Sequence, residues 1–175
     1  MKSDIEDAPV PAPWVALVVR SSAERRVQTG LTHAGLETFV PWHGVRRRWS
    51  DRFKIVDENL FPGYVFCRSR FAERSLVLNH PGVERVVSFD RVPALIPDAE
   101  ISSLRRLVSS ELPLAPWPYL KAGQRVRIET GTLAGIEGTL ARDSTGWRVV
   151  MNVSTVQRSI AVQVDRDMIR VVNPT

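Results

Sequence analysis

The chain has 175 residues, with 24 Lys and Arg against 19 Asp and Glu, a net charge of +5 and a single Cys. This length allows one domain or two small ones, and an apolar fraction of 43% is ordinary for a chain that buries a core. No apolar run approaches the ~18 residues of a membrane span, and the N-terminus lacks the apolar centre of a signal peptide. One Cys excludes an internal disulfide framework, so we expect a cytoplasmic protein. The small positive charge is compatible with an anionic partner or with none.

Proline and charge divide the chain into segments. Residues 1–13 carry three prolines and more acidic than basic side chains, so we expect a disordered tail. Residues 112–120 contain three further prolines. Because proline prevents helix and sheet-ladder hydrogen bonds, this segment predicts a semi-rigid extended linker. The sequence therefore predicts two domains, at 14–111 and 121–175.

The first predicted domain alternates strands with helices. The apolar run at 14–19 predicts a strand, and Ser21 and Ser22 are the expected N-cap of the helix that follows. Asp98 is the expected cap of a later amphipathic helix that runs to Val108. The remaining predicted elements are strands at 37–42, 60–67, 84–89 and 91–95, a helix at 71–79 and a long polar hairpin before residue 60. This pattern predicts an α+β fold, an antiparallel sheet flanked by helices.

The second predicted domain consists of short strands. Polar and apolar residues alternate in four runs, and glycines separate these runs where tight bends are needed. The runs cover residues 124–130, 137–141, 147–151 and 159–164. Because closure removes exposed sheet edges, short and closely spaced strands predict a small closed β-barrel.

Catalytic chemistry is poorly represented in the sequence. The three His residues have no metal-ligand spacing, and Cys67 lies in an apolar run, where a small core residue is expected. The phosphate-binding and nucleophile-elbow motifs that carry much enzyme chemistry do not occur. We therefore expect a protein that is not an enzyme and needs no cofactor or metal ion.

A basic and aromatic stretch, WHGVRRRWSDRFK, falls in the predicted hairpin. Cationic side chains neutralise phosphates and aromatic rings stack on bases, so this pattern is typical of a nucleic-acid contact. A solvated hairpin whose Trp residues pack on the sheet explains the same residues equally well. The candidate nucleic-acid-binding residues of this stretch are Arg46, Arg47, Arg48, Arg52 and Lys54.

The run LFPGYVF at 60–66 combines aromatic residues with Pro62 and Gly63, which predict a bend or bulge at a sheet edge. Strand alternation would place Phe61 on one face and Tyr64 on the other, unless the bend relaxes it. These side chains are either ordinary core or a docking surface for a partner helix.

Three segments carry a resemblance to a known family. LFPGYVF after a basic hairpin, followed by HPGVERVVSFDRVPALIPDAEI, resembles the N-terminal domain of the NusG family of transcription elongation factors. KAGQRVRIETGTLAGIEGTLAR resembles the KOW motif of an SH3-like barrel. The resemblance covers about residues 14–172. Within the family, WSDR, PALIPDAEI and VQRSIAVQVDRD are most similar to the specialised UpxY-type antiterminators of surface-polysaccharide operons.

This resemblance implies three contacts in the transcription complex. The first is with the coiled-coil clamp helices of the largest catalytic subunit of RNA polymerase, at Trp14, Val18, Phe61, Tyr64, Phe66 and Phe89. The second is with the opposing gate loop, at Glu73, Arg74 and Ser75, although specialised relatives carry a hydroxyl-rich set there. The third is with the non-template DNA strand of the transcription bubble, at Arg20, Arg25, Arg26, His33 and His80. A sequence-reading relative has His where this chain has Gly30.

The implied function is a non-catalytic factor that bridges the polymerase cleft and suppresses pausing and termination. The barrel would recruit a ribosomal small-subunit protein or the termination factor Rho. The alternatives are a housekeeping NusG-like factor coupled to Rho or the ribosome, and a KOW-type ribosome-associated RNA-binding protein. Some specialised relatives refold their C-terminal domain into helices. Here the β-branched residues of 149–164 favour strands, so a barrel is expected.

Overall fold

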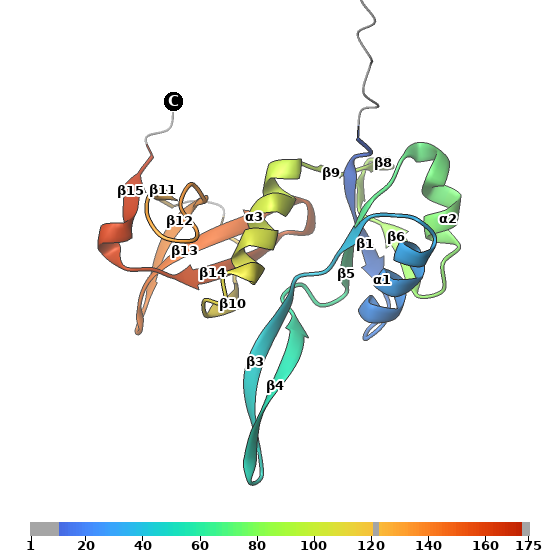
Figure 1. The fold of residues 1–175 in the computed structure, drawn as a ribbon. Coiled ribbons are helices and arrows are strands. Elements are labelled where there is room, and N and C mark those ends of the chain that lie inside the picture. Colours follow the sequence, from blue (N-terminus) through green and yellow to red (C-terminus); the bar gives the residue numbers. More distant parts are fainter. Residues whose placement is uncertain (1–10, 121–122, 173–175) are drawn as a thin grey trace, which may run out of the picture.

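The computed structural model describes residues 11–120 and 123–172, so the predicted disordered tail lies almost wholly outside the described residues. The N-terminal part is an α+β layer around one antiparallel sheet (Figure 1). Its strands follow the order β2-β5-β1-β6, and β9 also pairs with β1. The bounds are β1 Trp14–Val19, β2 Thr38–Phe39, β5 Tyr64–Arg68, β6 Val83–Val86 and β9 Leu95–Ile96.

Strand β1 is buried on both faces, which explains its continuous apolar sequence. Val15, Leu17 and Val19 join one core cluster with α1 (Glu24–His33) and α2 (Arg74–Leu78), while Trp14 and Ala16 join another with α3 (Asp98–Ser109). Because successive strand side chains point to opposite faces, α1 and α2 cover one side of the sheet and α3 the other. The predicted fold class is confirmed.

The two predicted helix caps are wrong. Helix α1 begins at Glu24 with Ala23 as N-cap and without a side-chain cap hydrogen bond. Ser21 and Ser22 form the preceding turn, in which Ser22 has a φ of 61°. Helix α3 has Pro97 as its N-cap, and Asp98 is already inside the helix. In both cases a tertiary contact of the acidic residue replaces local capping: Glu24 accepts a hydrogen bond from the Gly63 N–H and Asp98 from the Trp14 indole.

The predicted strand at 60–67 begins only at Tyr64, because residues 60–63 form a bend. Gly63 has a φ of 84°, a conformation that glycine adopts without steric cost, and the Tyr64 N–H donates to the Phe61 carbonyl at 3.1 Å. The bend brings Phe61 onto the same core as Phe66, with ring centroids 5.9 Å apart in an edge-to-face arrangement. Strict alternation across this run is therefore wrong.

Two hairpins leave the sheet. Strands β3 (Trp42–Trp49) and β4 (Arg52–Asn59) pair along their full length and project far from the rest of the chain (Figure 1). Strands β7 (Ser88–Phe89) and β8 (Val92–Pro93) form a much shorter hairpin. A short 3-10 turn, η1 (Phe71–Glu73), leads into α2, so the helix predicted at 71–79 is split in two.

The C-terminal part is one six-stranded antiparallel sheet in the order β10-β14-β13-β12-β11-β15. Its strands are β10 Leu114–Trp117, β11 Arg125–Ile128, β12 Glu137–Asp143, β13 Gly146–Val153, β14 Arg158–Gln163 and β15 Ile169–Val171. Two 3-10 turns, η2 (Ser154–Val156) and η3 (Arg166–Met168), lie beside β14 and β15. The segment 149–164 therefore consists mainly of β13 and β14, joined through η2, as its β-branched composition predicts. Below, the C-terminal part is called the barrel domain.

Part of the segment predicted as a linker is a strand of the barrel domain. Leu114 to Trp117 pair with β14 from Val162 to Ser159. Proline is tolerated because β10 is an edge strand, where a missing N–H faces no neighbour. Only residues 110–113 remain between the end of α3 and the start of β10.

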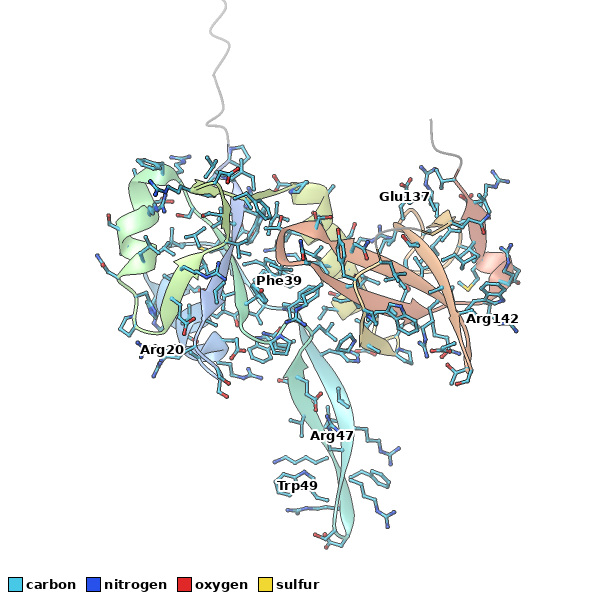
Figure 2. The ribbon with its side chains drawn as sticks, turned by 180° about the vertical axis from the view of Figure 1, so that it is seen from behind. Arg20, Phe39, Arg47, Trp49, Glu137 and Arg142 are labelled. Carbon is cyan, nitrogen blue, oxygen red and sulfur yellow. The ribbon has the colours of Figure 1, made fainter. Side chains whose placement is uncertain are left out.

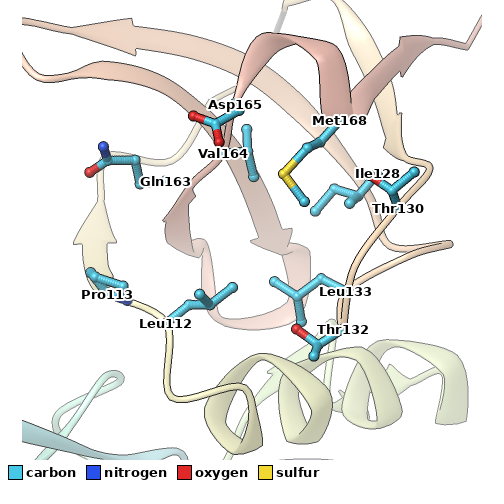
Figure 3. A pocket seen from close by; sticks show the side chains of 10 residues that line it. All are labelled: Leu112, Pro113, Ile128, Thr130, Thr132, Leu133, Gln163, Val164, Asp165 and Met168. Atoms are coloured by element: carbon cyan, nitrogen blue, oxygen red, sulfur yellow. The ribbon is translucent and has the colours of Figure 1, made fainter.

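Helix α3 lies between the sheet and the barrel domain (Figure 1). One continuous cluster of buried residues includes Trp14 and Phe66 of the sheet, Ile101 of α3, and Ile128 and Ile160 of the barrel domain. A pocket of about 330 Å³ remains where the barrel domain meets the segment after α3 (Figure 3). It is lined mostly by apolar side chains, among them Leu112, Leu133 and Met168.

Packing predicts that alanine substitutions at two glycines, Gly138 of the barrel domain and Gly44 of the β3–β4 hairpin, differ in their effect on stability. A Cβ at Gly138 would lie 2.6 Å from the Val150 carbonyl oxygen, whereas one at Gly44 of the hairpin would meet only the Ile55 Cγ2, at 3.1 Å. Because backbone cannot move aside as a side chain can, Gly138→Ala is expected to lower the free energy of unfolding by about 2 kcal/mol or more. Gly44→Ala should leave it within about 0.5 kcal/mol. Urea unfolding followed by tryptophan fluorescence measures both, and equal losses would contradict this packing.

Candidate functional site

The aromatic residues expected to contact a polymerase helix do not form one exposed surface. Trp14, Phe61 and Phe66 are at most 1% exposed and belong to the core between the sheet and α3. Val18 and Tyr64 are half-buried neighbours, paired across β1 and β5 on the same sheet face. Phe89 lies apart on the β7–β8 hairpin and is 58% exposed. The structure thus gathers five of the six side chains and separates one.

An ionic network fixes α3 over this aromatic face. Glu37 binds Arg68 at 2.7 Å and Arg105 at 2.8 Å, and Asp98 pairs with Arg68. The Trp14 indole N–H donates to Asp98 at 3.1 Å. These groups come from four separate segments, and no sequence motif links them. The network holds α3 on the sheet and positions the tryptophan ring.

Two guanidinium groups complete the cover over the aromatic rings. Arg68 lies 5.0 Å and Arg105 5.2 Å from the centre of the Trp14 ring, and Arg105 is 5.4 Å from that of Phe39. Cation–π attraction adds to the ion pairs. Phe39 also stacks on Phe66 with centroids 6.2 Å apart. Neither arginine nor Phe39 is among the predicted site residues, because the signal is tertiary.

The outward side of α3 binds the barrel domain through polar groups. Arg106 donates from Nη2 to the carbonyl oxygens of Thr132, at 3.1 Å, and Ala134, at 2.7 Å. Glu100 is half-buried, and its Oε1 has no hydrogen-bond partner among the described residues. Burial raises the pKa of the Glu100 carboxyl, and a hydrogen bond from the backbone of Ser154 opposes this only in part. The same interface therefore contains a stabilising guanidinium and a destabilising carboxylate.

The residues expected at the gate loop lie together at the start of α2. Glu73 ends η1, and its carboxylate accepts a hydrogen bond from the Arg70 N–H at 2.7 Å. Arg74 and Ser75 follow at the helix start. Arg74 also borders an apolar hollow of about 240 Å³ that includes the 84% exposed Phe71. Glu73, Arg74 and Ser75 therefore lie together at the junction of η1 and α2.

A basic hollow lies where α1 meets the loop before β6. Arg25, Arg26, Gly30 and His80 line it. A Cβ at Gly30 would lie 2.0 Å from the His80 Nε2, so the glycine is what allows the imidazole to pack on the helix. The backbone N–H of Arg20 donates to Gly82 at 2.9 Å, which places Arg20 beside the same loop.

Two predicted strand-contacting residues of this group, Arg20 and His33, do not line the hollow, and His33 lies farther along α1. It lies in the last turn of α1 and is exposed. Arg25 is not wholly free, since it binds Asp57 of β4 at 2.9 Å and lies 4.2 Å from the centre of the Trp42 ring. The Trp42 indole N–H donates to Gln28 of α1 at 2.9 Å. These contacts tie the hollow to the base of the β3–β4 hairpin.

The hairpin carries the remaining predicted nucleic-acid residues. Arg46, Arg47, Arg48, Arg52 and Lys54 are all exposed, on both strands. Figure 2 shows Arg47 and Trp49 on this projecting ribbon, away from the rest of the chain. Trp49 and Phe53 do not pack on the sheet, since they are 56% and 58% exposed, so the alternative in which the hairpin tryptophans pack on the sheet holds for Trp42 and fails for Trp49. Trp42 alone packs at the base.

The remaining chemistry-bearing groups are potential metal ligands and the single thiol. Within residues 11–120 and 123–172, no cluster of His, Cys, Asp and Glu could hold a metal ion. Cys67 is buried, and burial raises the pKa of its thiol to about 12, so the reactive thiolate is suppressed. No helix in these ranges is long and apolar enough to cross a membrane.

Fold and site together give an α+β protein with one aromatic and two basic candidate surfaces. A sequence model described as "Transcription termination factor nusG" matches residues 12–105, more than half of the chain. The chain therefore belongs to the NusG family, and it is a NusG-like transcription termination/antitermination factor.

Two known proteins illustrate the similarity. The chain is 25% identical over 171 residues to the transcription termination/antitermination protein NusG of Lactococcus lactis subsp. lactis (strain IL1403), covering 89% of this chain and 91% of the relative. A solved structure on domain interaction in Thermotoga maritima NusG matches with a TM-score of 0.57 at 20% identity. It covers 92% of this chain and 97% of its own, and it supports the fold.

The half-buried carboxylate of Glu100 predicts a pH dependence of stability. Since its pKa is raised in the folded chain, ionisation above the ordinary value of 4.5 costs stability, and this cost grows as pH rises through the raised pKa. Glu100→Gln is expected to remove that loss. Urea unfolding should show that the free energy of unfolding falls less between pH 5 and pH 7 in the variant than in the wild type. Glu84→Gln, at an exposed position, is the control and should follow the wild type. Identical decreases in all three proteins would contradict the assignment.

Proposed function

We propose that this protein is a specialised, UpxY-type antiterminator that binds RNA polymerase and suppresses pausing and termination. The observation that carries the proposal is the family match over residues 12–105, the segment that bears the aromatic sheet face, the residues at the start of α2 and the basic hollow. The family's proteins bind RNA polymerase. The specialised subtype is supported by the sequence segments WSDR, PALIPDAEI and VQRSIAVQVDRD.

The polymerase clamp helices are the proposed partner of the aromatic sheet face. Val18 and Tyr64 supply its accessible part, and Trp14, Phe61 and Phe66 form the rigid floor beneath them. A half-buried tyrosine beside an apolar floor suits such a contact, because burying its exposed part stabilises a complex at little cost in side-chain entropy. Phe89 lies outside this face and would act at its own position.

The other two contacts follow from the positions of polar residues. Glu73, Arg74 and Ser75, grouped at the start of α2, are the proposed contact with the opposing gate loop. The basic hollow with Arg25, Arg26 and His80, together with the neighbouring Arg20, is the proposed contact with the non-template DNA strand. His33 belongs to this proposal only as a flanking residue. A factor that touches both sides of the cleft resists its opening and thereby opposes pausing.

The barrel domain is the proposed recruitment module, with a ribosomal small-subunit protein or Rho as partner. In the structure its loop at 132–134 is held by Arg106 of α3, and its η2 turn lies at Glu100. A partner that uses these segments competes with α3. Recruitment is therefore coupled to release of the barrel domain from α3.

Tyr64 gives the direct test of the polymerase contact. Tyr64→Ala is expected to weaken binding to core RNA polymerase about tenfold or more, because a large apolar side chain contributes roughly 1.5–3 kcal/mol on burial. The control is Tyr119→Ala, which alters the chain's other tyrosine, also half-buried but in the barrel domain. Affinity is measured by titration with labelled protein, and circular dichroism confirms folding.

The same pair tests the function in transcription. Wild type and Tyr119→Ala should increase read-through of a pause and a terminator in vitro, whereas Tyr64→Ala should not. Polymerase affinity within twofold of wild type in a folded Tyr64→Ala protein would exclude the aromatic face. If the wild-type protein binds polymerase but increases termination, the result would instead favour a Rho-assisting role.

Arg106 tests the link between the domains. Arg106→Ala removes two hydrogen bonds from a charged donor to the barrel domain. The closed arrangement, in which the barrel domain contacts α3, should therefore become less populated. If closure limits access to the aromatic face, polymerase affinity should rise about threefold to tenfold. Small-angle scattering should show a larger radius of gyration. Arg170→Ala, at an exposed position of β15, should change neither quantity. A lower affinity for Arg106→Ala would contradict this coupling.

A further inference from the structure

We propose that the β3–β4 hairpin inserts into the major groove of double-stranded DNA, with one face of the ribbon toward each phosphate backbone. The inference deepens the nucleic-acid contact of the proposed function and assigns its two basic surfaces to different forms of DNA. The hollow on α1 would contact a single strand, and the hairpin a duplex.

The distal hairpin is free of the rest of the chain. Every side chain from Arg46 to Ile55 is exposed, and the ribbon stands clear of both domains (Figures 1 and 2). Three apolar side chains remain in solvent, with Trp49 at 56%, Phe53 at 58% and Ile55 at 73% exposure. Large apolar side chains left in solvent on both faces of a projecting element mark a contact surface.

Charge is segregated along the hairpin. Its distal half has four arginines and one lysine against a single acid, Asp51. The acidic residues near the base are already engaged, Asp57 with Arg25 at 2.9 Å and Glu58 with Arg47 at 2.7 Å. With Arg47 engaged by Glu58, the distal half still presents four other cations against Asp51, and this excess of positive charge selects an anionic partner.

Strand register distributes these cations over both faces. Directly paired residues share a face, so the pairs Arg46 with Ile55 and Arg48 with Phe53 lie on one side. The pairs formed by Arg47 with Lys54 and Trp49 with Arg52 lie on the other. Each face also holds a cation over a ring, with Arg46 4.0 Å from the centre of Phe53 and Lys54 5.7 Å from that of Trp49.

Two basic faces back to back suit a groove better than a single strand. A single strand tracks along one face of a binding platform, whereas a groove has phosphates on both of its walls. The major groove of B-form DNA is about 12 Å wide and admits a two-stranded ribbon. The major groove of an RNA duplex is too narrow for side chains to read. The eight paired rows of the hairpin extend roughly 26 Å, enough to reach deep into a groove.

The hairpin is held in a fixed direction relative to the single-strand hollow. Trp42 at its base donates to Gln28 of α1, and Arg25 bridges α1 to Asp57. Duplex and single-stranded DNA meet where a transcription bubble closes. The spacing of the two surfaces therefore suits an edge of the bubble.

The test uses the full chain and naked nucleic acids, so it needs no polymerase. Fluorescence anisotropy gives affinities for a 24-base-pair DNA duplex, one of its strands and the matching RNA duplex, across a series of salt concentrations. One variant removes two positive charges from each face, Arg46→Gln/Arg48→Gln from the first and Arg52→Gln/Lys54→Gln from the second. The control, Arg158→Gln/Arg170→Gln, removes the same charge from exposed positions of the barrel domain.

The expected result is tighter binding to the DNA duplex than to the RNA duplex or single strand. Each face variant should weaken duplex binding roughly tenfold and lower the salt slope by about 1.8, the value for two lost phosphate contacts. The control should change the affinity less than twofold. Since the altered side chains are exposed, thermal unfolding should be unchanged.

Several results would overturn the inference. The first is a loss of duplex affinity in only one of the two face variants, and the second is equal or tighter binding of single-stranded DNA or the RNA duplex. The others are no measurable binding of the DNA duplex at low salt and an equal loss of affinity in the control variant. Failure of the polymerase contact is scored separately, by Tyr64→Ala, because that variant leaves the hairpin intact. The two proposals can therefore fail independently.

Discussion

Burial of the amphipathic helix α3 is the interaction on which the rest of the structure depends. Ile101, Leu104 and Leu107 are at most 1% exposed within a core that continues from the sheet into the barrel domain. On the sheet side the helix is fixed by several ion pairs, and on the barrel side by Arg106 against an unfavourable Glu100. The helix is thus a firm part of the first domain and a weaker support for the second.

The positive charge of the chain has a definite location. Trp14, Phe61 and Phe66 lie in the core beneath α3 with Tyr64 beside them, whereas exposed cations, some of them ion-paired, lie on the hollow of α1 and the distal hairpin. Contacts of Gln28 with Trp42 and of Arg25 with Asp57 keep these two basic surfaces in fixed relation. Apolar contacts would supply most of the affinity for polymerase, and the basic surfaces would orient the nucleic acid around it.

Local sequence patterns predict the helices and strands, whereas tertiary contacts determine how the helices are capped and which strands lie at a sheet edge. The apolar run of β1, the basic hairpin and the stripe of α3 follow from residue spacing alone. The serines at 21 and 22 do not cap α1, because Glu24 turns to the bend at Gly63. Spacing also cannot show that Pro116 would sit on an edge strand. Edge position is a property of the assembled sheet.

The candidate site shows the same division. Family motifs place the aromatic and basic residues along the chain, but alternation misplaces Phe61 because a glycine bend resets the strand. The network of Glu37, Arg68 and Asp98 joins residues far apart in sequence and leaves no periodic signal. Burial of Glu100 depends on the position of the barrel domain, which no local pattern encodes.

The short connection before β10 limits where the barrel domain can act. With β10 retained in its sheet, only residues 110–113 can extend, and four residues reach roughly 14 Å. A domain on such a tether pivots close to α3 and has a very high local concentration there. Once released, it would search only a small volume beside the polymerase. A recruited partner would therefore have to approach the polymerase surface itself to be captured.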